Sequence, residues 1–301
     1  MSAFNNYLKH PQEVLSVMLM RTNFLYSDEI YIKLLFRLAM GYKLDLKNPK
    51  TYSEKLQWLK LHDHNPKYTK LVDKLAVKEI VKEKIGEQYV IPTLGVWERP
   101  EDIDWNNLPN QFVLKTTHGG GNTGVVICKD KGSFNEGKAI EKLKESLKQD
   151  LYRKLREWPY KDVPRRIIAE KYIEAENNDL PDYKFFCFDG EVKALFIGTE
   201  RGSGDVKFDY FDAEFNHLDL MQAHPMSGKE LPKPIHFEEM KQIAGNLSRG
   251  IPHVRIDLYN VNGSIYFGEY TFYHHGGITP FHPKEWDDIF GSWITLPANK
   301  D

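Results

Sequence analysis

The spacing of apolar residues divides the chain into a helical first part and a strand-rich remainder. Up to about residue 85, apolar residues recur at intervals of three and four, as in residues 31–38, and this period predicts amphipathic helices. A capping signal at Ser53, before Glu54, precedes another apolar series. A turn at 65–66 separates it from a helix expected over residues 71–84. Residues 1–66 are therefore interpreted as a helical N-terminal region.

After residue 88 the apolar segments become short and rich in β-branched and aromatic residues, which predicts strands. The expected strands are residues 89–94, 111–117, 125–128, 167–173, 183–188, 192–197, 208–211, 254–259 and 264–272. Charged helices are expected over residues 135–158 and 237–249. Because strands and helices do not alternate regularly, the pattern favours an α+β fold.

Charge and cysteine content narrow the classes of function. The 41 basic and 43 acidic residues nearly cancel, so no overall positive field favours a nucleic-acid partner. The two cysteines, Cys128 and Cys187, lie in strand-like runs, which argues against a disulfide framework and favours the reducing cytoplasm. Residues 30–40 are too short and too charged to span a bilayer. This segment is a helix packed on the core or a basic amphipathic helix on a membrane surface.

A glycine-rich loop is the most informative segment. Lys115 ends an apolar strand, residues 119–121 are three consecutive glycines, and Val125 begins another strand. Backbone N–H groups of glycines can approach phosphate oxygens closely, and Lys115 would add a positive charge. The segment matches neither a Walker loop nor a dinucleotide fingerprint. A phosphate-binding hairpin and a plain flexible hairpin tip both remain open.

A late hairpin carries two acids. Asn262-Gly263 is a strong hairpin signal, and it folds Asp257 back towards Glu269. Two converging carboxylates suit Mg²⁺ that also binds nucleotide phosphates. With a strict two-residue turn the two acids would point to opposite faces, so we predict an odd loop or a bulge here. The alternative is a solvated hairpin with two unrelated surface acids.

A central hairpin turns at Asp189-Gly190. A two-residue turn would place one apolar set on a single face: Tyr183, Phe185, Cys187, Val192, Ala194 and Phe196. Asp182 and Lys184 would project from the other face, which we expect to be free for chemistry. Lys184 could neutralise charge on a transferred phosphoryl group, and Arg201 could bind the same anion or a substrate carboxylate. Each could also be an ordinary surface cation.

The order of these segments resembles the ATP-grasp superfamily, and within it the branch named after the teichuronopeptide biosynthesis protein TupA. The resemblance rests on five segments over about residues 50–285: Asp73-Lys74, residues 112–115 with the glycine loop, residues 169–173, residues 182–184, and Asp257 with Glu269. It implies two α+β subdomains that clamp ATP, at about residues 88–172 and 173–301 of a catalytic domain over 67–301.

The resemblance also implies roles for individual residues. The ATP-binding residues would be Lys74, Lys115, Thr117, His118, Gly119, Gly120, Gly121, Glu170, Lys171, Tyr172 and Ile173. Within this set, residues 170–173 would form the adenine hinge, with the backbone of Lys171 and Ile173 reading the base edge. Asp257, Glu269 and Thr271 would hold magnesium, with Lys184 and Arg201 as catalytic residues.

Thr271 departs from the superfamily, which often has Asn at this position, so the metal site is expected to be looser or to include water. The neighbouring pair His274-His275 could bind substrate, act as a base or belong to a structural loop.

The expected function is an ATP- and Mg²⁺-dependent ligase that converts a carboxylate to an acyl phosphate, which an amine attacks. The resemblance places it in surface or capsular polysaccharide synthesis, with a uronic-acid or other small-molecule or saccharide carboxylate as substrate. Association with a membrane surface or a capsule-assembly complex stays open, and no nucleic-acid partner is expected. The alternatives are a glycosyltransferase that uses a nucleotide sugar and a non-catalytic nucleotide-binding scaffold.

Overall fold

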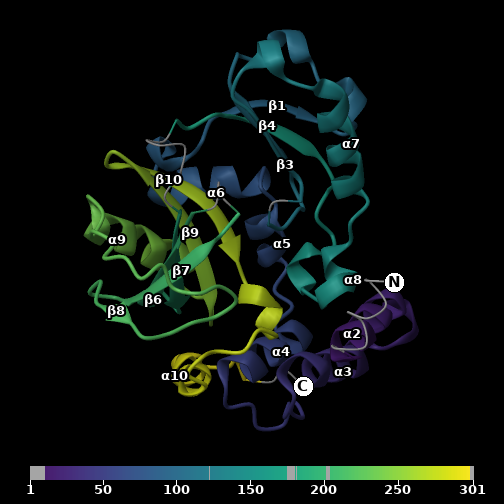
Figure 1. Ribbon diagram of the computed structural model, residues 1–301, viewed down its shortest axis with the longest axis vertical. Helices are drawn as coiled ribbons and strands as arrows, with labels where there is room; N and C mark the ends of the chain where they lie inside the picture. The colour runs from purple at the N-terminus through teal and green to yellow at the C-terminus, as the bar shows by residue number, and fades with distance from the viewer. Residues whose placement is uncertain (1–10, 122, 175–179, 181, 201–203, 299–301) are drawn as a thin grey trace.

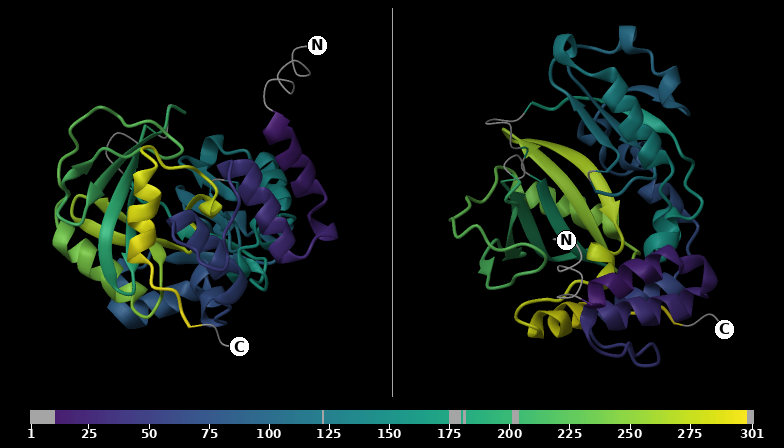
Figure 2. Two further views of the ribbon diagram at one scale, coloured as in Figure 1. Left: turned by 90° about the horizontal axis from the view of Figure 1, so that it is seen from below. Right: turned by 45° about the vertical axis from the view of Figure 1, so that its right-hand side comes forward.

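The computed structural model describes residues 11–121, 123–174, 180, 182–200 and 204–298. Helices come first along the chain and strands follow, as predicted (Figure 1). The helices of the first part are α2 (Pro11–Arg21), α3 (Asp28–Met40), α4 (Tyr52–His62), α5 (Lys67–Val72) and α6 (Ala76–Ile85). Helices α2 and α3 lie together at one end of the molecule, with α4 beside them (Figures 1 and 2).

Two helix predictions in the first part need correction. Helix α4 is capped by Thr51 and not by Ser53, because Thr51 accepts from the backbone of Glu54 while the Glu54 carboxylate accepts from the backbone of Thr51. The single helix predicted over 71–84 is α5 and α6, divided at Asp73. The Asp73 carboxylate accepts from the N–H groups of Leu75 and Ala76, which caps the start of α6.

The helix predicted over 135–158 is also divided. It consists of α7 (Glu136–Leu147), α8 (Leu151–Leu155) and the 3-10 helix η6 (Trp158–Tyr160). Asp150 caps α8 by accepting from the N–H of Arg153, and Arg156 ends α8 in the left-handed conformation with φ 56°. The remaining 3-10 helices are η1 (Asn23–Leu25), η2 (Glu87–Tyr89), η3 (Pro100–Asp102), η4 (Trp105–Asn107), η5 (Lys131–Ser133) and η8 (His274–Gly277).

Within the part of the chain that the structure describes, the strands form two antiparallel sheets. The small sheet has the order β1 (Thr93–Trp97), β4 (Ile167–Lys171), β2 (Phe112–Thr116) and β3 (Val125–Cys128). Strand β1 starts later than predicted, since residue 89 ends η2 and residues 90–92 lie outside any strand. One face carries buried Phe112 and Leu114 and packs with Leu143 of α7. The opposite face of β2 carries Lys115.

The large sheet has the order β10 (Ser264–Thr271), β9 (Val254–Val261), β5 (Asp182–Phe188), β6 (Glu191–Thr199), β7 (Lys207–Asp212) and β8 (His217–Leu218). Helix α9 (Phe237–Ser248) covers one face, where Phe237 packs on Phe185. Helices α4 and α10 (Glu285–Trp293) cover part of the other face, where Phe186 packs against Tyr52 and Phe290. Strand β5 is therefore buried on both faces, and the expectation of a free face is wrong.

The prediction of which side chains share a face of the central hairpin is also wrong for its second strand, β6. The Asp189-Gly190 turn pairs Cys187 with Val192, but the next pair is Phe186 with Ala194, so Lys193 is an extra residue in a bulge. Ala194 and Phe196 consequently share the face of Lys184. A shift of one residue reverses every later side chain of a strand, and the sequence contains no turn signal that marks this one.

The bulge predicted in the late hairpin is confirmed. Asn262-Gly263 form a two-residue turn, and strands β9 and β10 pair regularly up to Phe267. The register then shifts at Gly268, which places Glu269 directly opposite Asp257. A Cβ at residue 268 would lie 3.0 Å from the Asp257 carbonyl oxygen, so glycine fits this close approach.

Close packing of α10 on the start of α4 provides a test of the fold. In Gly291→Ala the new Cβ would lie 2.3 Å from the Lys50 carbonyl oxygen and 2.6 Å from the Tyr52 nitrogen. Alanine favours a helix by about 1 kcal/mol, but this clash with backbone cannot relax by a rotamer change. The free energy of unfolding should fall by about 1–3 kcal/mol in chemical denaturation. Gly137→Ala in α7, with its nearest neighbour 3.4 Å away, is the matched control and should not be destabilised.

Candidate functional site

A narrow cleft lies between α6, the small sheet and the edge strand β10. Its lining comes from these elements and from the segments before α6 and before β1: Lys74, Val77, Lys78, Val90, Ile91, Lys115, Glu170, Phe267 and Gly268. It includes Lys74, Lys115 and Glu170, three of the side chains predicted to bind ATP. Lys78 was not predicted, although it follows Lys74 by four residues, the spacing at which two side chains share one face of a helix.

Glu170 and two lysines form a buried ion cluster in this cleft. The Glu170 carboxylate lies 2.5 Å from the Lys78 ammonium and 2.6 Å from the Lys115 ammonium. Burial by itself would raise the pKa of Glu170, but Lys115 and Lys78 outweigh it and hold the pKa below its usual value. Burial would lower the pKa of Lys115, and Glu170 raises it instead. Glu170 and Lys115 therefore stay charged. With one carboxylate and two lysines, the cluster carries one positive charge in excess.

The end of β4 follows this cluster. The N–H of Lys171 donates to the Pro92 carbonyl at 3.0 Å, so a contact between Lys171 and a base edge would have to use its carbonyl oxygen. Tyr172 and Ile173 lie beyond the strand and are half-buried. The adenine hinge over these residues remains a prediction.

The glycine loop is held against α6 and α7. Thr117 is fully buried, its carbonyl accepts from the N–H of Lys74, and its hydroxyl donates to the Pro164 carbonyl. A Cβ at Gly119 would lie 2.4 Å from the Thr116 hydroxyl, so part of the glycine signal reflects packing within the loop. Gly121 adopts the left-handed conformation at φ 59° with open space around it. His118 is buried, and burial together with Arg165 lowers its pKa.

Gly120 has one near neighbour, Leu151, and continues the same loop. Thr117 and His118 are thus placed to support the loop, whereas residues 119–121 keep accessible backbone.

The three side chains predicted to hold a metal converge on one guanidinium group. The Arg255 Nη2 atom lies 2.8 Å from the Asp257 carboxylate, 3.0 Å from the Thr271 hydroxyl and 3.9 Å from the Glu269 carboxylate. The Arg255 Nε atom also donates to Asp257 at 2.7 Å. Arg255 and Asp257 are two residues apart along β9, so their side chains share a face. This spacing is visible in the sequence, although Arg255 was not among the predicted site residues.

Lys184 completes this charged group. Its ammonium contacts the carboxylates of Asp257 and Asp182, the latter at 2.7 Å. Burial would raise the pKa of Asp257, but Arg255 and then Lys184 outweigh it and lower the pKa to about 2. Lys184 thus lies beside the predicted metal ligands. Arg201, the other predicted catalytic residue, lies outside the described residues.

Lys74 joins the glycine loop to the paired acids. Its ammonium donates to the Gly119 carbonyl at 2.5 Å and lies 3.4 Å from the Glu269 carboxylate. The loop and the acids, which are about 150 residues apart along the chain, therefore meet at one side chain. Lys74, which lines the cleft, thus connects it to one of the predicted metal ligands.

His274, which follows β10, contacts the charged group of the site through Arg255. The Nδ1 atom of His274 accepts from Arg255 at 2.6 Å, and His274 is fully buried. Burial, followed by His275 and Arg255, keeps the pKa of His274 well below its usual value. A neutral His274 that holds Arg255 in place favours the structural interpretation of this loop.

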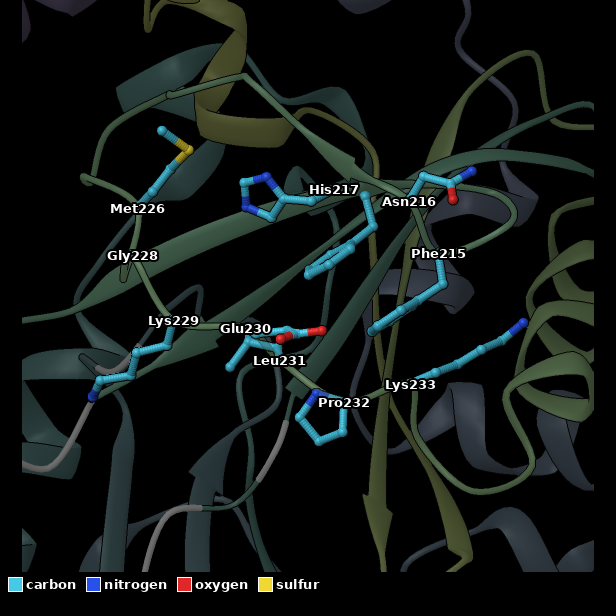
Figure 3. A pocket seen from close by; sticks show the side chains of 11 residues that line it. Phe215, Asn216, His217, Met226, Gly228, Lys229, Glu230, Leu231, Pro232 and Lys233 are labelled. Atoms are coloured by element: carbon cyan, nitrogen blue, oxygen red, sulfur yellow. The ribbon is translucent and has the colours of Figure 1, made fainter.

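The large cavity in Figure 3 is a different place. It measures about 760 Å³ and lies between β7, β8 and residues 226–233. Phe211 in its wall alternates with Tyr210, and Tyr210 shares a face with Phe196 and Lys184 through the strand pairs. The cavity therefore opens on the opposite face of the large sheet from Lys184, and we do not assign it to the site.

Comparisons with known proteins agree with the sequence resemblance. A family model described as TupA-like ATP-grasp matches residues 54–295. No curated protein matches the chain.

Three solved structures illustrate the likeness of fold. A D-alanine–D-alanine ligase from Bacillus anthracis has 18% identity and a TM-score of 0.39, over 67% of this chain and 57% of that one. The ATP-grasp ligase PsnB with a variant of its minimal precursor, Mg and ADP has 12% identity and a TM-score of 0.40, over 73% and 58%. A D-alanine–D-alanine ligase from Helicobacter pylori has 13% identity and a TM-score of 0.40, over 88% of this chain and 69% of that one. The chain spans less than two thirds of the first two, and the likeness is too distant to transfer an activity.

Two buried histidines, His253 and His274, allow a prediction of how the stability of the fold depends on pH. The His253 ring nitrogens bond the Cys187 carbonyl and the Tyr52 hydroxyl, and burial lowers the pKa of His253 to about 3. His274 is likewise held neutral. Their folded pKa values lie below the unfolded value near 6.5, so their contribution is complete above that pH and is lost as the pH falls. Each of these two histidines should make the free energy of unfolding decline by up to about 1.4 kcal/mol per pH unit below pH 6.

Denaturation at a series of pH values checks this slope. His253→Gln keeps hydrogen-bonding groups but does not titrate, so it should reduce the slope by up to about 1.4 kcal/mol per pH unit. The exposed His236, which sits at φ 62°, offers the control His236→Asn, since asparagine tolerates this conformation. An unchanged slope in His253→Gln would contradict the assignment.

Proposed function

Because the chain belongs to the TupA-like ATP-grasp family, we propose that it is an ATP- and Mg²⁺-dependent ligase that joins a carboxylate to an amine. The observation that carries the proposal is the position of Lys74 between the Gly119 carbonyl and the Glu269 carboxylate. A triphosphate at Lys74 would touch the glycine loop on one side and the paired acids on the other. This arrangement suits transfer of a terminal phosphoryl group to an acid.

In this proposal the nucleotide lies in the cleft lined by α6, β2, β4 and β10. The excess positive charge of Lys78 and Lys115 over Glu170 attracts its phosphates. Residues 67–301 act as the catalytic domain, in which residues 88–172 supply the glycine loop and residues 173–301 supply the acids. Residues 1–66 are a separate helical region in this division.

Magnesium is part of the proposal, and the donor atoms fit it. No group of three His, Cys, Asp or Glu side chains able to hold a metal occurs in the described ranges. The hard-oxygen donors Asp257, Glu269 and Thr271 instead surround one positive nitrogen of Arg255. Two carboxylates with nucleotide phosphates are a usual set for Mg²⁺, which would neutralise phosphate charge when bound.

The chain's own cations prepare the rest of the reaction. Arg255 and Lys184 are fixed by Asp257 and Asp182, so they are already oriented towards an anion and need not reorganise. They would stabilise the negative charge that develops as the phosphoryl group passes to the substrate carboxylate. The burial of Arg255 strengthens this effect by excluding water.

The finer identity of the substrates follows the resemblance. We propose a uronic-acid carboxylate, free or within a saccharide, and an amino acid or similar amine, in the synthesis of surface or capsular polysaccharide. Both cysteines are free and buried, consistent with a cytoplasmic protein. None of the described helices is long and apolar enough to cross a membrane.

Product analysis tests the proposal against its alternatives. The purified protein with ATP, Mg²⁺ and a panel of uronic acids and amino acids should release ADP only when both a carboxylate and an amine are present. Release of UDP from a nucleotide sugar would instead indicate a glycosyltransferase. Nucleotide binding without turnover on any pair would favour a non-catalytic scaffold.

Glu269→Gln tests the metal assignment with little risk to the fold, because this side chain is 31% exposed and its ionic contacts are long. We expect Mg²⁺-dependent turnover to fall at least about 100-fold, since the amide is a poor ligand for a hard cation. Turnover as a function of Mg²⁺ concentration checks this, with the exposed Glu214→Gln as control. Full activity at ordinary Mg²⁺ would refute the role of Glu269.

Lys115 and Lys184 are expected to affect different steps. Lys115→Met should weaken ATP binding by about 10- to 100-fold in calorimetry, because it removes a charged hydrogen-bond partner. Lys184→Met should slow phosphoryl transfer more than it weakens binding. Lys193→Met in the same hairpin, whose cation pairs with Glu191, is the control. Equal effects of both substitutions on binding and rate would undermine this division.

A further inference from the structure

A ring of contacts encloses the backbone of Lys74, just before α6. The Asp73 carboxylate accepts from the Arg166 Nη2 atom at 2.7 Å. The Arg166 backbone is bonded twice to Thr117: its N–H donates to the Thr117 hydroxyl at 3.0 Å, and its carbonyl accepts from the Thr117 N–H at 2.9 Å. The Thr117 carbonyl in turn accepts from the N–H of Lys74 at 3.1 Å, which closes the ring. Three segments that are distant along the chain thus meet here.

Asp73 performs two tasks in this ring. One carboxylate oxygen caps α6 by accepting from the N–H groups of Leu75 and Ala76, and the other accepts from Arg166. Asp73 is 3% exposed, and Arg166 is the one cation paired with it in the part of the chain that the structure describes. A buried carboxylate needs its charge compensated, so Arg166 holds the orientation of Asp73 and with it the cap.

The ring determines where the Lys74 side chain points. Its backbone is held on one side by Thr117 and on the other by the capping residue before it. The ammonium reaches the Gly119 carbonyl and the Glu269 carboxylate. A long side chain can adopt many rotamers, and a fixed backbone restricts those that reach both partners. The position of the ammonium therefore depends on the ring.

Arg166 can influence the nucleotide cleft only through its neighbours. Among the described residues, the lining of the cleft includes Lys74 but not Arg166. The Arg166 side chain is 28% exposed, and its guanidinium donates to Asp73. An effect of Arg166 on a nucleotide would pass through Asp73 and Lys74, so its role would be that of a positioning residue and not of a direct ligand.

A second attachment holds α6 independently of Arg166. One turn after Lys74, the Lys78 ammonium donates to the Ile91 carbonyl at 2.6 Å and lies 2.5 Å from the Glu170 carboxylate. These contacts join α6 to β4 and to the segment before β1. Loss of the Arg166 contact should therefore loosen the first turn of α6 and leave the rest of the helix in place.

We propose that Arg166 is the positioning residue for a phosphate contact made by Lys74. Through Asp73 it holds the first turn of α6, so that the Lys74 ammonium stays between the glycine loop and the paired acids. This inference rests on the proposed function, in which the nucleotide phosphates bind at Lys74. Because the ammonium is held in place before the phosphates arrive, binding loses less free energy in ordering it.

Binding of a non-hydrolysable ATP analogue with Mg²⁺, measured by calorimetry on the full chain, tests this role. Arg166→Met removes the pairing cation, whereas Asp73→Asn removes the pairing charge and keeps a side chain that caps helices equally well. The two substitutions are measured alone, together, and each in a Lys74→Met background. Arg99→Met is the matched control, because Arg99 also pairs with an aspartate, Asp102, but on the exposed surface.

Arg166→Met and Asp73→Asn should each weaken binding of the analogue by about 5- to 20-fold, since each leaves the first turn of α6 without its anchor. The double variant should lose no more than either single variant, because both break the same contact. In the Lys74→Met background, either substitution should change the affinity by less than about 2-fold. Arg166→Lys keeps a cation and should retain part of the affinity, and Arg99→Met should bind as the wild type does.

A purely structural role predicts a different pattern. If Arg166 only stabilised the fold, Arg166→Met would weaken binding equally with and without Lys74, and this result would overturn the proposal. Unchanged affinity in Arg166→Met or in Lys74→Met would overturn it too. Thermal unfolding verifies that each variant is folded, and Asp73→Asn supplies the measurement if Arg166→Met is not. Absence of binding by the wild type would refute the proposed function itself, so the two failures are distinguishable.

Discussion

The burial of Arg255, on β9 beside the end of β10, constrains the whole site. A buried guanidinium costs several kcal/mol unless its charge is compensated and its N–H groups are bonded. Asp257 compensates the charge, and Thr271 and His274 accept from the remaining nitrogens. These contacts hold together a strand, the strand beside it and the loop after it, so none of the three can shift without leaving a buried charge unpaired.

The same compensation explains why a site rich in cations is stable without its ligand. Lys184 is neutralised by Asp182 and Asp257, and Lys115 and Lys78 share Glu170. Lys74 connects the two groups through Gly119 and Glu269. In the proposed function, the phosphates and the metal would take over contacts that these carboxylates and cations already make with one another. Because the side chains are held in place beforehand, binding requires little reorganisation.

The helical N-terminal region acquires a physical role from this geometry. Its contacts with Lys154 and Arg156 hold α8 and the residue that ends it.

The sequence by itself determined the class of fold and most strands, whereas only the family resemblance implied that the glycine loop and the acids meet. The sequence also predicted an odd loop or a bulge in the late hairpin, because two acids can share a face of that hairpin only when one residue is added, and the structure has the bulge. The family resemblance agreed with the match over residues 54–295. Only the tertiary structure decided the bulge at Lys193, the division of the helices over 71–84 and 135–158, and the importance of Lys78 and Arg255. Periodicity reports which face a residue occupies within its own element, whereas charge compensation and pKa depend on groups that come from distant parts of the chain.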